Sequence, residues 1–130
     1  MREFNQTEIN YIFEITKIIT LFSKTLPYDV ACEEELFNFW QLTYLYEGER
    51  TSFIEDIPHR ILSGQLIFNP PGIPHYSVKE LNKDAKIGII SFICPSKSMD
   101  FFKHKVFTLK SKEKKLLFYF TKYLRLNFLQ

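Results

Sequence analysis

The sequence predicts an all-β barrel that is followed by a single C-terminal α-helix. Short segments rich in β-branched and aromatic residues recur over the first 95 residues, and glycine, proline and asparagine stand between them. Strands at such intervals are typical of β-sandwiches and β-barrels. Beyond residue 95 the apolar residues change to a helical spacing. This change of period divides the chain into a barrel, residues 1–95, and a connector with a helix, residues 96–130.

The clearest predicted strand covers residues 39–47. Tyr44 and its even-numbered neighbours are apolar or aromatic, whereas Gln41 and Thr43 on the alternate positions are polar. This period of two marks a strand with two different faces. Residues 87–93 are almost continuously apolar, which indicates a strand covered on both faces. The remaining predicted strands are residues 15–22, 51–57, 59–62, 65–68 and 75–78, with Pro58 between the second and the third.

Residues from Ser111 onward predict the C-terminal helix. Leu117, Phe120 and Leu124 recur at intervals of three and four, so they share one stripe of the helix surface. Ser111 is the expected N-cap, and the helix dipole favours Glu113 in the first turn. The stripe carries more apolar surface than one barrel contact needs, so we expect two copies of the chain to pair through it. The alternative is a helix that packs only on its own barrel.

A single domain is expected from 130 residues and 15.6 kDa, because domains most often contain about 100–150 residues. Apolar residues make up 45% of the chain and aromatic residues 17%, which excludes a disordered protein. No apolar run approaches the roughly 20 residues of a membrane helix, and no signal-peptide pattern opens the chain. We therefore expect a cytoplasmic protein. Cys32 and Cys94 have no C-x-x-C spacing and are expected to be reduced thiols.

Charge is distributed unevenly along the chain. The net charge is +2, but residues 97–130 contain nine basic and two acidic residues. A lysine-coated helix explains this distribution, and contact with nucleic acid is the alternative. No recognition-helix motif accompanies the lysines, so direct nucleic-acid binding by this chain is the weaker interpretation. Residues 33–35, three glutamates, are expected to form a solvated loop, and His59 to lie on an exposed hairpin.

One motif stands out, and it spans residues 64–75. Its fixed positions are Gly64, Pro70, Gly72 and His75 in the spacing G-x5-P-x-G-x2-H. Proline cannot donate to a sheet and glycine accepts the positive φ of a tight turn, so the motif ends one strand sharply and begins another at His75. The spacing resembles the second conserved motif of the cupins. This resemblance implies a double-stranded β-helix, or jelly-roll, barrel.

A wider resemblance joins this motif to residues 40–48, Trp-Gln-Leu-Thr-Tyr-Leu-Tyr-Glu-Gly, and residues 89–92, Ile-Ile-Ser-Phe. Together they resemble the N-terminal sensor domain of AraC-type transcription regulators over about residues 10–128. The resemblance implies a barrel that binds a small effector, often a sugar, and a helix that pairs two subunits. It also implies an N-terminal arm, here residues 1–10, and a DNA-binding domain with two helix-turn-helix motifs, which we expect to be absent from this chain.

The resemblance to catalytic cupins identifies where a metal would bind. Those cupins hold a metal with two histidines and a glutamate on the first motif and one histidine on the second. Here Gln41 aligns with the glutamate, Glu35 and Phe37 align near the two histidines, and His75 alone is kept. A stable transition-metal site needs three or four good ligands. We therefore expect no metal, no cofactor and no catalysis; a weak site of Glu35 and His75 is the alternative.

The barrel interior is also where an organic ligand is expected. Polar side chains of one parity share the interior face if the strands alternate regularly, and aromatic faces beside them suit a polyhydroxylated ligand. Hydrophobic burial alone would turn Gln41 outward. We reconcile the two by a polar face that lines a wet cavity and an aromatic face that the N-terminal strand covers. A hydrogen-bonded barrel residue without a ligand is the alternative role of His75. The predicted ligand-binding residues are Phe37, Gln41, Thr43, His75, Ser77, Lys79 and Phe92.

These inferences combine into one function. We expect the effector-sensing and dimerisation domain of an AraC-type regulator, which binds a sugar or sugar derivative in its barrel. Such a domain forms a homodimer through the C-terminal helix and reaches DNA only through the absent domain. The alternative is a small metal-dependent cupin enzyme that acts on a sugar or another small metabolite.

Overall fold

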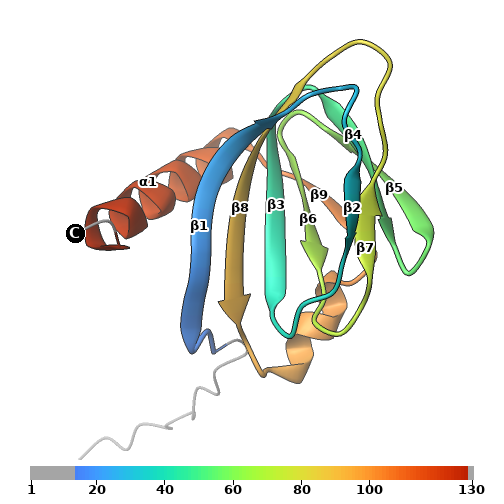
Figure 1. Cartoon of the computed structure of the whole chain (residues 1–130). Helices are drawn as coiled ribbons and strands as arrows, with labels where there is room; N and C mark the ends of the chain where they lie inside the picture. The colour runs from blue at the N-terminus through green and yellow to red at the C-terminus, as the bar shows by residue number, and fades with distance from the viewer. Residues whose placement is uncertain (1–13, 129–130) are drawn as a thin grey trace, which may run out of the picture.

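Two antiparallel β-sheets face each other in the computed structural model, which describes residues 14–128 (Figure 1). One sheet has five strands in the order β1-β8-β3-β6-β9, and the other has four in the order β2-β7-β4-β5. After β8 come a short 3-10 helix, η1, then β9 and the C-terminal helix α1. This confirms the predicted all-β barrel with a C-terminal helix. The elements are β1 (Lys17–Leu26), β2 (Cys32–Glu35), β3 (Trp40–Glu47), β4 (Glu49–Ile54), β5 (Ile57–Leu62), β6 (Gln65–Asn69), β7 (His75–Ser77), β8 (Ala85–Ile93), η1 (Lys97–Phe102), β9 (Val106–Thr108) and α1 (Ser111–Phe128).

Two short strands differ from the prediction. The glutamates of residues 33–35 lie in β2, which pairs with β7, and not in a loop. Their charge suits this position because β2 is a sheet edge, where charged side chains discourage further pairing. The strand β9 pairs with β6, so the barrel extends beyond residue 95 into the segment expected to be a connector. Pro58 lies within one continuous strand, β5; this is also an edge, where a missing N–H is tolerated.

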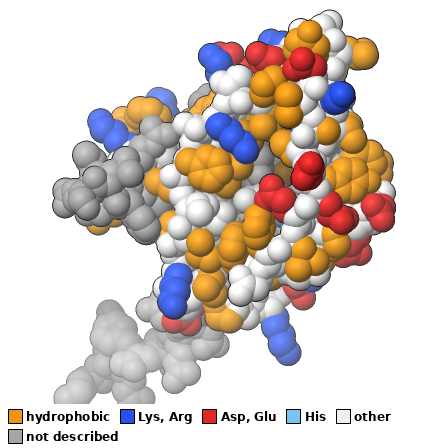
Figure 2. Space-filling model, viewed as in Figure 1, with side chains coloured by type: hydrophobic (Ala, Val, Ile, Leu, Met, Phe, Trp, Pro, Cys, Tyr) orange, Lys and Arg blue, Asp and Glu red, His pale blue; other side chains and the backbone are white. Residues whose placement is uncertain are grey.

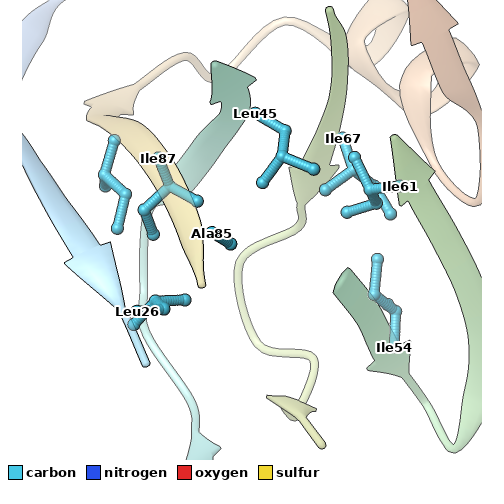
Figure 3. Packing of buried hydrophobic residues seen from close by; sticks show 8 residues of the cluster. Leu26, Leu45, Ile54, Ile61, Ile67, Ala85 and Ile87 are labelled. Atoms are coloured by element: carbon cyan, nitrogen blue, oxygen red, sulfur yellow. The ribbon is translucent and has the colours of Figure 1, made fainter. Parts of the chain in front are cut away.

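The apolar core lies inside the barrel, between the two sheets (Figure 3). Leu45 and Ile67 come from the five-stranded sheet, and Ile54 and Ile61 come from the four-stranded sheet. Each of these four side chains is at most 1% exposed. Burial of such side chains is the main stabilising contribution to a barrel of this kind. The whole cluster is Leu26, Leu45, Ile54, Ile61, Ile67, Ala85, Ile87 and Ile89.

A second apolar cluster covers the outer face of the five-stranded sheet. Trp40 and Phe92 are its large aromatic members, and Met99 of η1 and Leu117 of α1 pack against them. The aromatic face is therefore covered by η1 and α1. The expectation that the N-terminal strand covers this face is wrong, because β1 pairs with β8 as an edge of the same sheet. Phe92 consequently belongs to this outer cluster and not to the barrel interior.

The helix α1 begins with half of a capping box. The carboxylate of Glu113 accepts a hydrogen bond of 3.1 Å from the backbone N–H of Lys110, so Lys110 takes the N-cap position expected of Ser111. Leu117 is half-buried on the outer cluster, whereas Phe120 is 45% exposed. The side chain of Leu124 lies outside the described residues. Four further apolar side chains of α1 are exposed: Leu116, Phe118, Tyr119 and Tyr123. The pairing of two copies of the chain through this helix stays a prediction.

Within residues 14–128, neither helix combines the length and the apolar character that crossing a membrane requires. The cytoplasmic location stays a prediction. The expected N-terminal arm, residues 1–10, lies outside the described residues.

Candidate functional site

A cavity of about 110 Å³ lies between the two sheets, beside the apolar core. Its wall takes residues from both sheets, including β1 and β2, which are the sheet edges on one side of the barrel. This volume is sufficient for several water molecules or one small organic molecule. Figure 2 shows Lys/Arg and Asp/Glu side chains on the face of the molecule where these two edges lie. The polar part of the wall is Lys24, Glu33, Glu35, Gln41, Thr43, Arg50, Ser52, Asn69, His75, Tyr76 and Ser77.

Four of the predicted ligand-binding residues lie in this wall: Gln41, Thr43, His75 and Ser77. Gln41 and Thr43 face inward because β3 alternates, with Leu45 continuing the same face into the apolar core. The polar face of β3 therefore lines the cavity, while its aromatic face lies under η1 and α1. Whether these four side chains bind a ligand stays a prediction.

Three predicted ligand-binding residues lie elsewhere. Phe92 is buried in the outer cluster. It directly follows Ser91, which faces inward, and neighbouring residues of a strand point to opposite faces. Lys79 is exposed, because β7 ends at Ser77 and the alternation ends with it. Phe37 is not among the residues that line the cavity; its ring stacks on Phe39 at 4.7 Å and lies 5.7 Å from the ring of His75, which does line it. The placement of Phe92 and Lys79 inside the barrel is corrected, and a role of Phe37 in binding stays a prediction.

A row of polar side chains crosses the inner face of the five-stranded sheet. Thr20 pairs with Ser91, Ser91 with Gln41, and Gln41 with Asn69, on four adjacent strands. The Asn69 amide Nδ2 donates a hydrogen bond of 3.3 Å to Gln41 Oε1. Among residues 14–128, however, the buried atoms Thr20 Oγ1, Ser91 Oγ and Asn69 Oδ1 have no hydrogen-bond partner. Buried polar atoms without partners are rare in proteins. Of these three residues only Asn69 lines the cavity, so Asn69 Oδ1 is the atom at which a polar ligand would be stabilised.

His75 faces the polar row from the other sheet. It pairs with Glu35 of β2 on one side and with Ile54 of β4 on the other. Its buried Nδ1 makes no hydrogen bond of ordinary geometry within the described part of the chain. Burial lowers the pKa of His75 below 6.5, and the negative charge of Glu35 and the backbone carbonyl of Ile73 offset only part of this effect. At neutral pH the imidazole is therefore uncharged and can accept a proton.

Arg50, Ser52 and Asn69 also line the cavity and are not among the predicted ligand-binding residues. A signal for them exists in the strand period. Arg50 and Ser52 share the parity of the buried Ile54, and Asn69 shares that of the buried Ile67. Polar residues on the buried parity of a strand indicate either a paired polar group or a binding site. His59 does not lie on an exposed hairpin as expected; it is only 9% exposed, and its ring stacks on that of His104.

The residues present do not fit a transition-metal site. Glu35 and His75 reach the cavity together, but Gln41 offers only a neutral amide as a third group. In the described residues no group of three or more histidine, cysteine, aspartate or glutamate side chains is placed to hold a metal ion. The chemistry of this cavity therefore rests on its own side chains.

Comparison with solved structures shows the cupin fold. The chain is similar to a predicted oxalate decarboxylase from Thermotoga maritima, with a TM-score of 0.56 and 17% identity over 59% of this chain and 68% of that one. It is also similar to the DMSP lyase DddQ from Ruegeria pomeroyi, with a TM-score of 0.50 and 13% identity over 68% of this chain and 41% of that one. A salicylate 1,2-dioxygenase from Pseudoaminobacter salicylatoxidans gives a TM-score of 0.50 and 16% identity over 67% of this chain and 24% of that one.

Comparison by sequence gives no match: no protein-family model matches the chain, and no curated protein matches it either. The structural likeness shows a cupin barrel, and it does not show an AraC-type regulator. The expectation that the chain is not an enzyme is contradicted, because the solved structures that share its fold include a lyase and a dioxygenase.

Proposed function

We propose that this chain is a cupin enzyme that binds a small polar organic molecule in the barrel cavity. The observation that carries the proposal is a polar-lined cavity whose wall includes two buried atoms without a hydrogen bond of ordinary geometry among the described residues, Asn69 Oδ1 and His75 Nδ1. An unpartnered buried polar atom costs about 1–3 kcal/mol, and a ligand that bonds to such an atom recovers this free energy. In a barrel filled by its own apolar side chains, such buried polar atoms would only destabilise the fold.

His75 is the residue that gives this cavity chemical capability. An imidazole whose pKa is lowered is unprotonated at neutral pH and so available as a proton acceptor, and the cavity supplies amide and hydroxyl groups to orient a ligand beside it. The chemistry that this arrangement supports is removal of a proton from the bound molecule and its return. Because the donor set does not fit a metal, the metal-dependent form of the enzyme expected as an alternative is not part of this proposal.

Ligand binding is tested by thermal shift of the full chain against monosaccharides, glycerol and small carboxylic acids with their amides. A compound that binds only the folded chain should raise the melting temperature by several degrees at about 100 times its Kd. Gln41→Ala and His75→Ala should each remove most of this shift while leaving a cooperative unfolding transition. Lys79→Ala, a nearby exposed site, should keep it. If every compound leaves the melting temperature unchanged, the proposal fails.

Proton transfer is tested by dissolving the best-binding compound with the protein in D2O and following loss of its C–H signals by proton NMR. Wild-type protein should catalyse the exchange, and His75→Gln should slow it by at least about a hundredfold. Because the pKa of His75 is lowered, the rate should persist below pH 6.5 and decline only once the imidazole is protonated in the folded chain. A rate unchanged in His75→Gln would exclude this role.

The effector-sensing function that the AraC resemblance implies is the second candidate, because it needs the same binding step. The exposed apolar side chains of α1 favour it, since a sensor of that type pairs two subunits. A compound that binds with the shift described above but undergoes no exchange at any pH would favour the sensor over the enzyme.

A further inference from the structure

Arg50 is an unusual residue of the cavity wall. It lies on β4 and is only 3% exposed, although arginine is rarely buried unless its charge is paired. Its Nε donates to the hydroxyl of Ser77 at 3.1 Å, and its Nη1 donates to the carbonyl of Pro27 at 3.3 Å. Its Nη2 donates to the carbonyl of Val30 and lies 3.9 Å from the sulfur of Cys32. The guanidinium is thus held in place by neutral groups.

No carboxylate pairs with this charge. Across residues 14–128, Arg50 takes part in no ion pair. The exposed Arg60 on the neighbouring strand β5 shows the contrast, because Glu49 and Glu80 bind it at 2.6 and 2.7 Å. Water screens Arg60 in any case, whereas a buried guanidinium has lost most of its hydration and gains much more from a nearby negative charge.

Arg50 lines the cavity and keeps one donor for such a charge. Of the two N–H groups on Nη1, one goes to Pro27, and the other has no partner among the described residues. Ser52, two residues further along β4 on the same face, lines the same cavity. Together the two side chains offer donors to a group with two oxygen atoms. The carboxylates of Glu33 and Glu35 also line the cavity, but they are exposed on the edge strand β2, where solvent weakens their repulsion.

We infer that the molecule bound in this cavity carries a carboxylate, and that Arg50 is the residue that selects for it. The inference rests on the proposed function, because it names the class of ligand for the same cavity. It follows from the buried, unpaired guanidinium: a carboxylate supplies the missing negative charge, whereas a neutral polyol or amide leaves the guanidinium unpaired. The structure thereby favours an organic acid over the sugar that the sequence analysis expected.

The test compares acids with their own amides, which match them in shape but not in charge. The probes are propionate, benzoate and succinate against propionamide, benzamide and succinamide, titrated into the full chain by calorimetry at pH 7.5. At least one acid should bind at least about tenfold more tightly than its amide, because a charged hydrogen-bond pair is stronger than a neutral one. Arg50→Gln should abolish that preference, Arg50→Lys should keep part of it, and Arg60→Gln should leave it unchanged.

The outcomes separate this inference from the proposed function. Because Arg50 also holds the segment between β1 and β2, circular dichroism must first show that each variant is folded. The comparison of acids with amides on the wild-type protein does not depend on the variants. If sugars or amides bind as well as the acids or better, the carboxylate inference is overturned and the small-molecule cavity remains. If neither acids nor neutral compounds bind, the proposed function fails and this inference fails with it.

Discussion

Ile54→Ala is expected to lower the free energy of unfolding by about 2–5 kcal/mol, the range found for deleting a large aliphatic side chain from a packed core. Ile54 is 0% exposed and belongs to the interior cluster that joins the two sheets. Alanine would leave a void between those sheets, which the surrounding strands can close only in part. Urea unfolding measures the loss, with fluorescence of Trp40, the single and buried tryptophan, as the signal.

The matched control for this prediction is Ile57→Ala. Ile57 is the cross-strand partner of Ile54 at the turn between β4 and β5, but it is 47% exposed. Removal of an exposed side chain usually changes stability by about 0.5 kcal/mol or less. Equal losses from the two variants would mean that the interior cluster does not carry the stability assigned to it.

Gly48→Ala is expected to destabilise the chain for two separate reasons. Gly48 has φ +88, a conformation that costs a residue with a side chain about 1–2 kcal/mol. A Cβ at this position would also lie 2.5 Å from the carbonyl oxygen of Asp84 and 3.0 Å from the Cα of Ala85. Both contacts are with backbone, so neither can be relieved by rotating a side chain. The loss in urea unfolding should therefore be well above the cost of φ alone.

Gly72→Ala separates the two reasons. Gly72 has a similar φ of +72, but a Cβ there would have no heavy atom within 4 Å. Its cost should be about 1–2 kcal/mol, from the backbone conformation alone. Should Gly48→Ala prove no worse than Gly72→Ala, the close approach of the β3–β4 turn to Asp84 would not be a real constraint on the fold.

The fold was largely predictable because its signals are local. The motif over residues 64–75 predicts the end of β6 and the beginning of β7, and the change of apolar spacing predicts α1. The strands β2 and β9 were not predictable in this way. Each has only three or four residues and no alternating pattern, and each exists because a neighbouring strand, β7 or β6, offers it a backbone edge.

The candidate site was predictable only in part, for a related reason. Parity places Gln41 and Thr43 on one face of β3, but it does not say which face is inside, and both faces prove to be covered. The row from Thr20 to Asn69 depends on the register of four strands that lie far apart in the sequence. The unpaired charge of Arg50 was equally hidden, since only the fold shows that no carboxylate lies against it.

The strand β3 separates two environments by the thickness of one peptide chain. Gln41 faces the cavity, while its immediate neighbours Trp40 and Leu42 face the outer cluster on which Leu117 of α1 rests. A ligand that displaced β3 on its inner side would therefore also displace the surface on which α1 packs. Through this one strand, occupancy of the barrel would reach the outside of the protein without a hinge or a moving lid.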